Sequence, residues 1–213
     1  MQADITSGNR DFNIDVVTKF FEESLVNDND VRLPSYINAF RELNKFIALL
    51  GKGFNFIEKD LLEKEKILND LYVLDSSHYA TVNSMISCES RSAQSSRKGS
   101  RTLLRLHRAL LFITDFLKNL NQSREGDQIS ALCQSSYDNT LSKHHSWIIR
   151  QCVRVATRFL ASRDILLKAV NDGKMFKNEL EVQQAITKLV TAAEQVYGRV
   201  QQIYKNENIL DLP

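Results

Sequence analysis

Apolar residues recur at every third or fourth position along most of this chain, and that spacing restricts its fold more than any other feature. It is the period of a helix with one buried face. Within 100–121 such a stripe consists of Leu103, Leu106, Leu110, Ile113, Leu117 and Leu120. Only two prolines and seven glycines interrupt the 213 residues, too few for the many turns of a β-sandwich or β-barrel. The sequence therefore predicts an all-α fold.

The same period places helices near 11–27, 35–50, 54–73, 76–90, 100–121, 127–142, 146–160, 163–171 and 177–205. Pro34 suits a first helical position, and Gly51 and Gly53 are expected to break or kink one long helix. The polar, basic segment 91–100 is expected to be a loop whose Gly-Ser end caps the next helix. With no long linker and no repeat of about 20 to 50 residues, residues 1–213 are expected to form one domain.

The cysteines and the overall hydropathy indicate a cytosolic protein. Cys88, Cys133 and Cys152 are odd in number and widely spaced, and neither a CxxC pair nor a signal-peptide pattern is present. We expect three reduced thiols. No apolar run approaches the roughly 20 residues that a membrane span requires.

Basic residues are concentrated in two tracts, although the net charge is only +2. Residues 90–114 contain six basic residues and no acid, and residues 139–163 contain five basic residues and no acid. Such tracts indicate an anionic partner, whether nucleic acid, a membrane surface or a phosphorylated small molecule.

The helix at 100–121 has a second stripe, which runs from arginine into phenylalanine and consists of Arg101, Arg105, Arg108, Phe112 and Phe116. Because the leucine stripe already supplies a core face, this second face is expected to be surplus to folding. A solvated basic surface is the alternative. Arginine suits phosphate because its planar fork donates two hydrogen bonds while staying charged. The stripe therefore fits a ligand with an anionic end and an apolar end.

Asp60 and Lys64 lie one helical turn apart on an otherwise apolar face, which is formed by Phe56, Ile57, Ile67 and Leu71. The simple interpretation is a surface ion pair worth ~0.3–0.5 kcal/mol. Charges beside apolar surface are costly unless a partner satisfies them. The polar head of a ligand is such a partner.

His144, His145 and Trp147 form the remaining cluster of interest. Adjacent histidines on a helix point about 100° apart and cannot bind one metal ion from the same face, so neither a metal site nor a cofactor is expected. His145 is either structural or makes one hydrogen bond inside a pocket. Trp147, which precedes a basic stripe beginning at Arg150, is either a core residue or an interfacial anchor on an anionic bilayer.

Catalytic motifs are absent from the sequence: it contains no GxSxG, no Walker lysine loop and no HExxH. Asp60 and His145 would be the only acid and base, without a nucleophile to accompany them. An enzyme is the least favoured interpretation.

Three segments, in order, resemble the glycolipid transfer protein superfamily and specifically its ceramide-1-phosphate branch: FNFIEKDLLEKEKIL, GSRTLLRLHRALLFITDFL and HHSWIIRQCVRVATRFLASRDILLKAV. The similarity runs from about Leu33 to near the C-terminus. It implies a two-layer sandwich of about eight helices that encloses a lipid, with the head group at a surface cleft and the chains buried between the layers.

The resemblance also implies roles for individual residues. Asp60 matches the aspartate that takes the sphingoid amide N–H, and His145 matches the histidine that binds the amide carbonyl. Lys64 stands where glycolipid-selective members have asparagine, and Arg105 stands where they have a sugar-stacking tryptophan. Both differences indicate a phosphate head group, and Arg101 matches a further phosphate-binding arginine.

The resemblance implies roles for further residues in less detail. Trp147 matches the membrane-docking tryptophan of the family, and a third family arginine corresponds to either Arg91 or Arg97. Phe56, Phe112 and Phe116 are expected to line the apolar pocket for the lipid chains.

The resemblance thus implies non-vesicular transfer of a phosphate-headed sphingolipid, ceramide-1-phosphate above others, by a cytoplasmic protein that docks transiently on anionic membranes. Two alternatives stay open: a transfer protein for another sphingolipid or for a diacyl phosphate such as phosphatidic acid, and a sensor or adaptor that binds lipid without net transport. A nucleic-acid-binding protein would explain the basic tracts but gives no reason for Phe112 and Phe116, so no nucleic-acid partner is expected.

Overall fold

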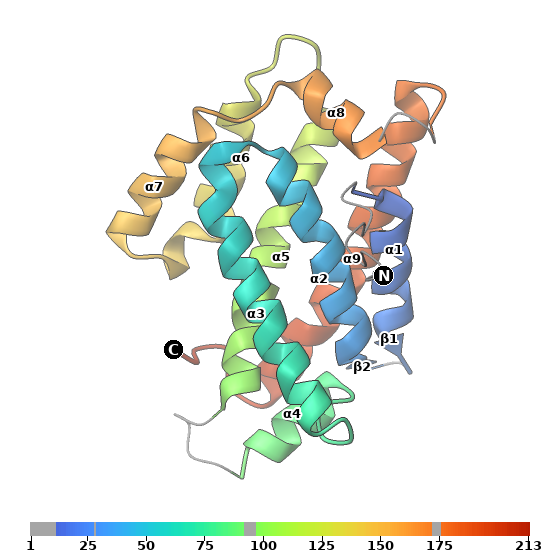
Figure 1. Cartoon of the computed structure of the whole chain (residues 1–213), viewed down its shortest axis with the longest axis vertical. Coiled ribbons are helices and arrows are strands. Elements are labelled where there is room, and N and C mark those ends of the chain that lie inside the picture. Colours follow the sequence, from blue (N-terminus) through green and yellow to red (C-terminus); the bar gives the residue numbers. More distant parts are fainter. Residues whose placement is uncertain (1–11, 28, 92–96, 172–175) are drawn as a thin grey trace, which may run out of the picture.

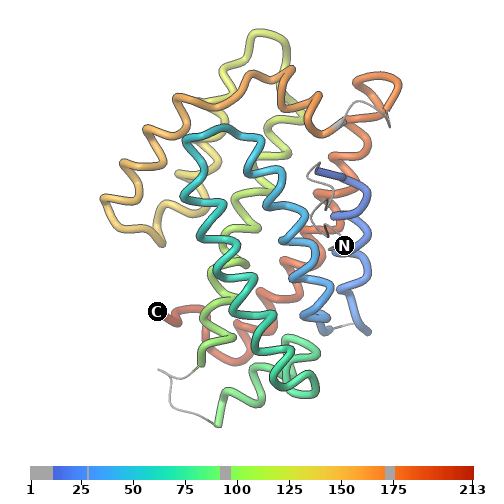
Figure 2. Tube along the Cα trace, viewed as in Figure 1, coloured from blue at the N-terminus to red at the C-terminus, as the bar shows by residue number. Residues whose placement is uncertain are grey.

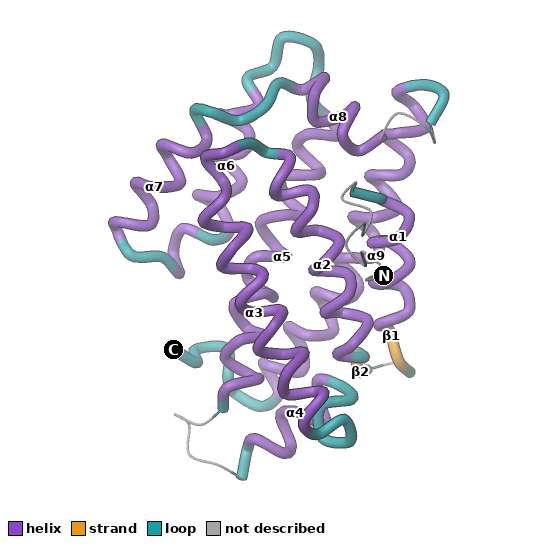
Figure 3. Tube along the Cα trace, in the orientation of Figure 1, coloured by secondary structure: helices purple, strands orange, loops and turns teal. Residues whose placement is uncertain are grey.

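The computed structural model describes residues 12–27, 29–91, 97–171 and 176–213, and these fold almost entirely into helices, as Figure 3 shows. The helices are α1 Ile14–Ser24, α2 Leu33–Leu49, α3 Asn55–Leu74, α4 Val82–Glu89, α5 Lys98–Gln122, α6 Ile129–Thr140, α7 Trp147–Thr157, α8 Arg163–Asn171 and α9 Glu179–Asn206. Short 3₁₀ turns, η1 and η3, span Lys52–Phe54 and Ser142–His144, and two antiparallel strands span Leu25–Val26 (β1) and Asp30–Val31 (β2). The all-α prediction is confirmed.

The helices form two layers (Figures 1 and 2). Helices α1, α2 and α3 lie side by side in one layer, and α9, α5 and α6 lie side by side behind them. Helix α1 packs against α9 and α3 packs against α5, so the two layers meet along their length. Within the described ranges, no helix combines the length and the hydropathy that crossing a bilayer needs.

The core lies between the layers, and α5 contributes most to it. Every member of its leucine stripe is buried, as predicted from the spacing: Leu103, Leu106, Leu110, Ile113, Leu117 and Leu120. Full burial of one such side chain contributes about 1.5–3 kcal/mol. This stripe therefore fixes the orientation of α5 and with it the direction in which the arginines of the helix point.

The expected break at 51–53 is confirmed. Helix α2 ends at Leu49, Gly51 has a φ of 115°, and a 3₁₀ turn leads into α3. A residue with a side chain is strained at that φ, which glycine adopts without penalty. The turn sends α3 back alongside α2 and brings Asp60 and Lys64 to face α5.

The expected start of α5 was wrong by one half-turn. Residues 92–96 of the predicted loop lie outside the described residues, but α5 begins at Lys98, so Gly99 and Ser100 belong to its first turn and do not cap it. The carboxylate of Glu89 caps the helix instead, accepting from Gly99 N (2.7 Å), Ser100 N (2.8 Å) and Ser100 Oγ (2.6 Å). Helix α4 thereby anchors the end of α5 from which the arginines project.

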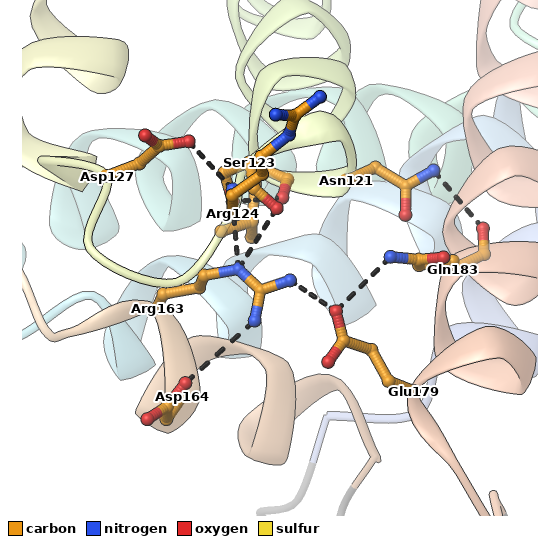
Figure 4. A network of polar contacts seen from close by, with 9 residues as sticks. Asn121, Ser123, Arg124, Asp127, Arg163, Asp164, Glu179 and Gln183 are labelled. Carbon is orange, nitrogen blue, oxygen red and sulfur yellow. Dashed lines mark hydrogen bonds and ion pairs between the residues drawn. The ribbon is translucent and has the colours of Figure 1, made fainter.

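A polar network ties the other end of α5 to α8 and α9 (Figure 4). Nε of Arg163 donates to both the carbonyl and the hydroxyl oxygen of Ser123, each at 3.2 Å, and its guanidinium pairs with Glu179 at the start of α9. Nearby, Nδ2 of Asn121 donates to the Gln183 carbonyl at 3.3 Å. With both of its ends held, α5 is a rigid platform for the site.

Candidate functional site

A cavity of about 610 Å³ lies between α3 and α5, where η3, the first turns of α7 and the C-terminal residues close around it. Most of its wall is apolar and includes Ile47, Phe54, Phe56, Ile57, Leu61, Phe112, Ile113 and Val153. Its polar wall residues are Asp60, Lys64, Arg105, Arg108, Tyr137, His144, His145 and Ser146. The cavity therefore suits an amphiphile, with the polar groups gathered on a few elements.

Helix α3 brings Phe56, Asp60 and Lys64 to the cavity because they are spaced one turn apart. Lys64 and Asp60 form an ion pair in which the lysine side chain is 11% exposed and the aspartate 58% exposed. The ion pair of the simple interpretation is therefore present, and the side chain of Lys64 lies along the cavity wall. Ile67 and Leu71, expected on the same face, are half-buried and do not line the cavity.

Helix α5 contributes Arg105, whose side chain is exposed. We call the edge formed by Asp60, Lys64 and Arg105 the charged edge. One helical turn after Arg105, Arg108 also lines the cavity and donates to the Leu210 carbonyl at 2.7 Å. Burial lowers the pKa of Arg108, and nearby Asp211 opposes this effect.

Several wall residues were not predicted as site residues. Arg108 belonged to the arginine stripe but carried no assigned role, and the C-terminal residues Leu212 and Pro213 also close the cavity. The signal for Arg108 was its position seven residues after Arg101. No feature of the sequence predicted that Leu212 lines the cavity, since its position depends on how the chain turns after α9.

Arg101 lies one turn before Arg105 and is half-buried, but it does not belong to the cavity wall. Its Nε is buried without a hydrogen-bond partner among the described residues, and the same holds for Nε of Arg97. The Arg97 guanidinium donates to the Ser90 carbonyl at 3.4 Å, whereas Arg91 is exposed. Both Arg97 and Arg101 thus keep donor capacity beside the first turns of α5.

The phenylalanine part of the α5 stripe was wrongly expected to be surplus to folding. Phe112 and Phe116 stack with ring centroids 6.2 Å apart, and they are 6% and 1% exposed. Phe112 lines the cavity, but Phe116 lies one turn further along the helix within the core and is absent from the wall. The stripe passes into the core because the layers close together beyond Phe112.

His145 reaches the cavity because η3 ends one residue before it. Its Nδ1 lies 2.9 Å from the hydroxyl oxygen of Tyr137 on α6. Burial lowers the pKa of His145, an effect that Asp60 opposes and Lys64 reinforces. Burial also lowers the pKa of His144. Both imidazoles are therefore mainly neutral near pH 7.

Trp147, the first residue of α7, is 67% exposed, which excludes the core interpretation. Ile148 beside it is 65% exposed, and the exposed face of the helix continues with Arg150, Arg154 and Arg158. Helix α7 therefore presents apolar and cationic side chains together at the side of the cavity.

The site has no features of a metal centre. Across the described ranges, no three or more His, Cys, Asp or Glu side chains gather in a way that could hold a metal ion. Cys88, Cys133 and Cys152 are all free thiols, and none of them lines the cavity.

The two-layer helical sandwich and its largely apolar cavity suit a protein that binds an amphiphile, and comparison with known families identifies the class. Residues 31–172 match the glycolipid transfer protein (GLTP) family. The chain belongs to this family of lipid transfer proteins.

Individual relatives are similar over nearly their whole length. The ceramide-1-phosphate transfer protein of Rattus norvegicus is 38% identical, with 96% of this chain and 98% of the relative covered. Its Homo sapiens counterpart is 34% identical, with coverage of 95% and 97%.

Solved structures agree with the fold. The mouse ceramide-1-phosphate transfer protein without lipid superposes with a TM-score of 0.88 at 36% identity, over 95% of this chain and all (100%) of that one. The human protein in complex with 12:0 ceramide-1-phosphate superposes with a TM-score of 0.86 at 33% identity and the same coverage of 95% and 100%.

Proposed function

We propose that this protein transfers ceramide-1-phosphate between membranes without chemically converting it. The observation that carries the proposal is that Asp60 and Lys64 of α3, Arg105 of α5 and His145 after η3 meet on the wall of one largely apolar cavity. The relatives that this chain resembles over 95% or more of its length are ceramide-1-phosphate transfer proteins, which supports the same substrate.

The charged edge suits the phosphate. A phosphomonoester carries about −1.5 to −2 charges near neutral pH. Lys64 and Arg105 together supply two positive charges, with Arg101 one turn before Arg105 on α5 as a third donor. Arginine donates in bidentate geometry and lysine acts as a point charge, so the two types hold the phosphate in complementary ways.

Asp60 and His145 suit the amide of a ceramide. An ionised carboxylate only accepts hydrogen bonds, so it pairs with the amide N–H, and a neutral imidazole donates one N–H to the amide carbonyl. Phosphatidic acid offers ester carbonyls but no N–H, so it gives Asp60 no hydrogen-bond donor. The amide pair therefore favours a sphingolipid over a diacyl phosphate.

The apolar wall is what makes transfer possible. Moving roughly 30 methylenes from a bilayer into water costs about 25 kcal/mol at ~0.8 kcal/mol each, so an unprotected lipid leaves the membrane very slowly. Phe56, Phe112 and their neighbours replace water around the chains during transit. The protein needs no catalytic group for this task, because no covalent bond forms or breaks.

Docking is assigned to α7. The exposed Trp147 and Ile148 suit the interfacial layer of a bilayer, and the arginines of α7 suit anionic head groups. Contact is expected to be peripheral and transient, at cytoplasmic membrane surfaces, where the free thiols would remain reduced.

Vesicle-to-vesicle transfer of fluorescent ceramide-1-phosphate tests the proposal. We expect rapid transfer by the wild type, and a loss of about tenfold or more in Arg105→Leu, because a charge-assisted hydrogen bond to phosphate is worth roughly 1.5–3 kcal/mol. Arg124→Leu is the matched control, since Arg124 is exposed just after the opposite end of α5; it should transfer normally. A wild type that binds the lipid but does not move it would be a sensor, and equal transfer by Arg105→Leu would refute the assigned head-group site.

A further inference from the structure

Tyr137 is a cavity residue to which the predicted roles give no task, and its surroundings hold it in one position. It lies on α6, is 2% exposed, and packs edge-on against Phe112 with ring centroids 6.3 Å apart. On the other side its ring lies 5.7 Å from that of His145, centroid to centroid. Its hydroxyl oxygen is 2.9 Å from His145 Nδ1. The phenol is therefore packed from one side and hydrogen-bonded on the other.

The direction of this hydrogen bond follows from the need to satisfy a buried phenol. Within the described part of the chain, the Tyr137 hydroxyl makes this hydrogen bond and no other. If Nδ1–H donated to the phenol oxygen, the phenol proton would have no acceptor among the described residues, and an unsatisfied buried donor costs roughly 1–3 kcal/mol. If the phenol donates, both groups are satisfied. Nδ1 is then the acceptor, and the ring proton of the neutral imidazole is on Nε2.

The other tautomer would not serve the proposed ligand. With the proton on Nδ1, the remaining nitrogen is an acceptor, and it would repel the carbonyl oxygen that His145 is expected to bind. With the proton on Nε2, that nitrogen is a donor before any lipid arrives. Asp60 and Lys64 face the same histidine across the cavity, but neither is within hydrogen-bonding distance of its ring in this structure. The hydrogen bond from Tyr137 therefore determines the tautomer.

We propose that Tyr137 is a positioning residue that fixes His145 as the Nε2–H tautomer, so that the imidazole presents a ready donor to the acyl carbonyl of the lipid. The effect on lipid binding rests on the proposed function. The tautomer itself is a property of the lipid-free protein and can be measured without lipid. A pre-oriented donor loses less freedom when the ligand binds, which is how preorganisation increases affinity. Tyr137 acts through His145 and has no required contact with the lipid.

Nitrogen NMR of the lipid-free protein tests the tautomer directly. Wild type should show a protonated Nε2 and an unprotonated Nδ1 for His145, with the signals assigned by their loss in His145→Gln. In Tyr137→Phe, which keeps the ring packed on Phe112 but removes the hydroxyl, the two nitrogens should move toward each other as the tautomers mix. A fold effect alone would not produce this change in an otherwise unperturbed spectrum.

Transfer measurements on the same variants complete the test. Tyr137→Phe should transfer ceramide-1-phosphate about fivefold more slowly, the effect of losing a hydrogen bond of ordinary net strength. Tyr72→Phe is the matched control, because this half-buried tyrosine near the end of α3 makes no hydrogen bond through its hydroxyl within the described ranges. It should change neither the His145 signals nor transfer.

The possible results distinguish the role of Tyr137 from the proposed transfer function. An active wild type with His145 protonated on Nδ1, or a Tyr137→Phe variant with unchanged tautomer or unchanged transfer, would overturn the role of Tyr137 and leave the proposed function standing. A wild type that shows the Nε2–H tautomer but transfers no ceramide-1-phosphate would overturn the proposed function, and with it the purpose assigned to Tyr137.

Discussion

Glu65 follows Lys64 on α3 but points into the protein and away from the charged edge. It is 3% exposed, and its Oε1 is buried without a hydrogen-bond partner among the described residues. Asn44 on α2 likewise has a buried Oδ1 without a partner. Burial raises the pKa of Glu65 from 4.5 to about 7, an effect that Arg41 opposes. Consecutive residues on α3 thus place a lysine on the cavity wall and a carboxyl group in the protein interior.

The raised pKa of Glu65 predicts that stability falls as pH rises from about 4.5 to about 7. In that range the folded protein keeps a proton that the unfolded chain has released, so the unfolding free energy decreases with pH, here by about 2 kcal/mol. Glu65→Gln is always neutral and should remove this decrease. Urea denaturation of both proteins at pH 5 and pH 7.5 measures it.

The control for this prediction is Glu63→Gln, an exposed glutamate on the same helix. It should retain the wild-type pH dependence. If wild type and Glu65→Gln lose stability in parallel between the two pH values, the carboxyl of Glu65 does not carry the effect.

At single positions, the sequence was most informative where residue type and helical spacing coincide. Asp60, Lys64 and Arg105 could be placed on their faces from periodicity, and the family resemblance decided between the two interpretations of His145. Tyr137 was missed because its partner lies eight residues away across a 3₁₀ turn, a relation that no helical period encodes. Phe116 was wrongly expected in the cavity wall. Helical spacing predicts on which side of α5 it lies, but not whether the residue at that position borders the cavity or the core.

At the scale of elements, helix interiors were predictable and their ends were less so. The start of α5 depends on Glu89, which belongs to another helix, so local capping signals around Gly99 and Ser100 were misleading. A Cβ atom at Gly99 would lie 2.8 Å from both Glu89 Oε1 and Met85 Sδ. A larger residue at position 99 would therefore displace the ends of these two α4 side chains, a tertiary constraint that the sequence alone does not reveal.

Helix α7 is the element whose exposed face predicts membrane contact. Trp147→Ala should bind anionic vesicles about tenfold or more weakly, because the indole contributes a large apolar area to the interface at roughly 25 cal/mol per Å². Added salt should weaken the binding of both proteins, since each arginine near an anionic surface contributes about 1 kcal/mol. Vesicle sedimentation at low and high salt measures both effects.

Leu180→Ala is the control for α7. Leu180 is 61% exposed in the first turn of α9, which lies across the molecule from α7 (Figure 1). Its loss should leave vesicle binding unchanged. Equal binding by wild type and Trp147→Ala would place the docking surface elsewhere.

At the scale of the whole molecule, two layers of helices leave a cavity whose wall residues are spread along the sequence from Ile47 to Pro213. Helix α3 supplies Asp60 and Lys64, α5 supplies Arg105, and the segment after α6 supplies His145. The all-α class followed from periodicity, and the two-layer arrangement followed from the resemblance. Closure by the C-terminal Leu212 and Pro213 followed from neither, because it depends on Arg108 holding the Leu210 carbonyl.

Native mass spectrometry after incubation with mixed vesicles tests the central claim most directly. The vesicles should contain equal amounts of ceramide-1-phosphate, phosphatidic acid and galactosylceramide, so that the three lipids compete for one cavity. The charged edge and the amide pair together predict one ceramide-1-phosphate per chain as the dominant bound species. A protein that leaves the vesicles without lipid, or that carries the sugar-headed or diacyl lipid equally well, would contradict the account.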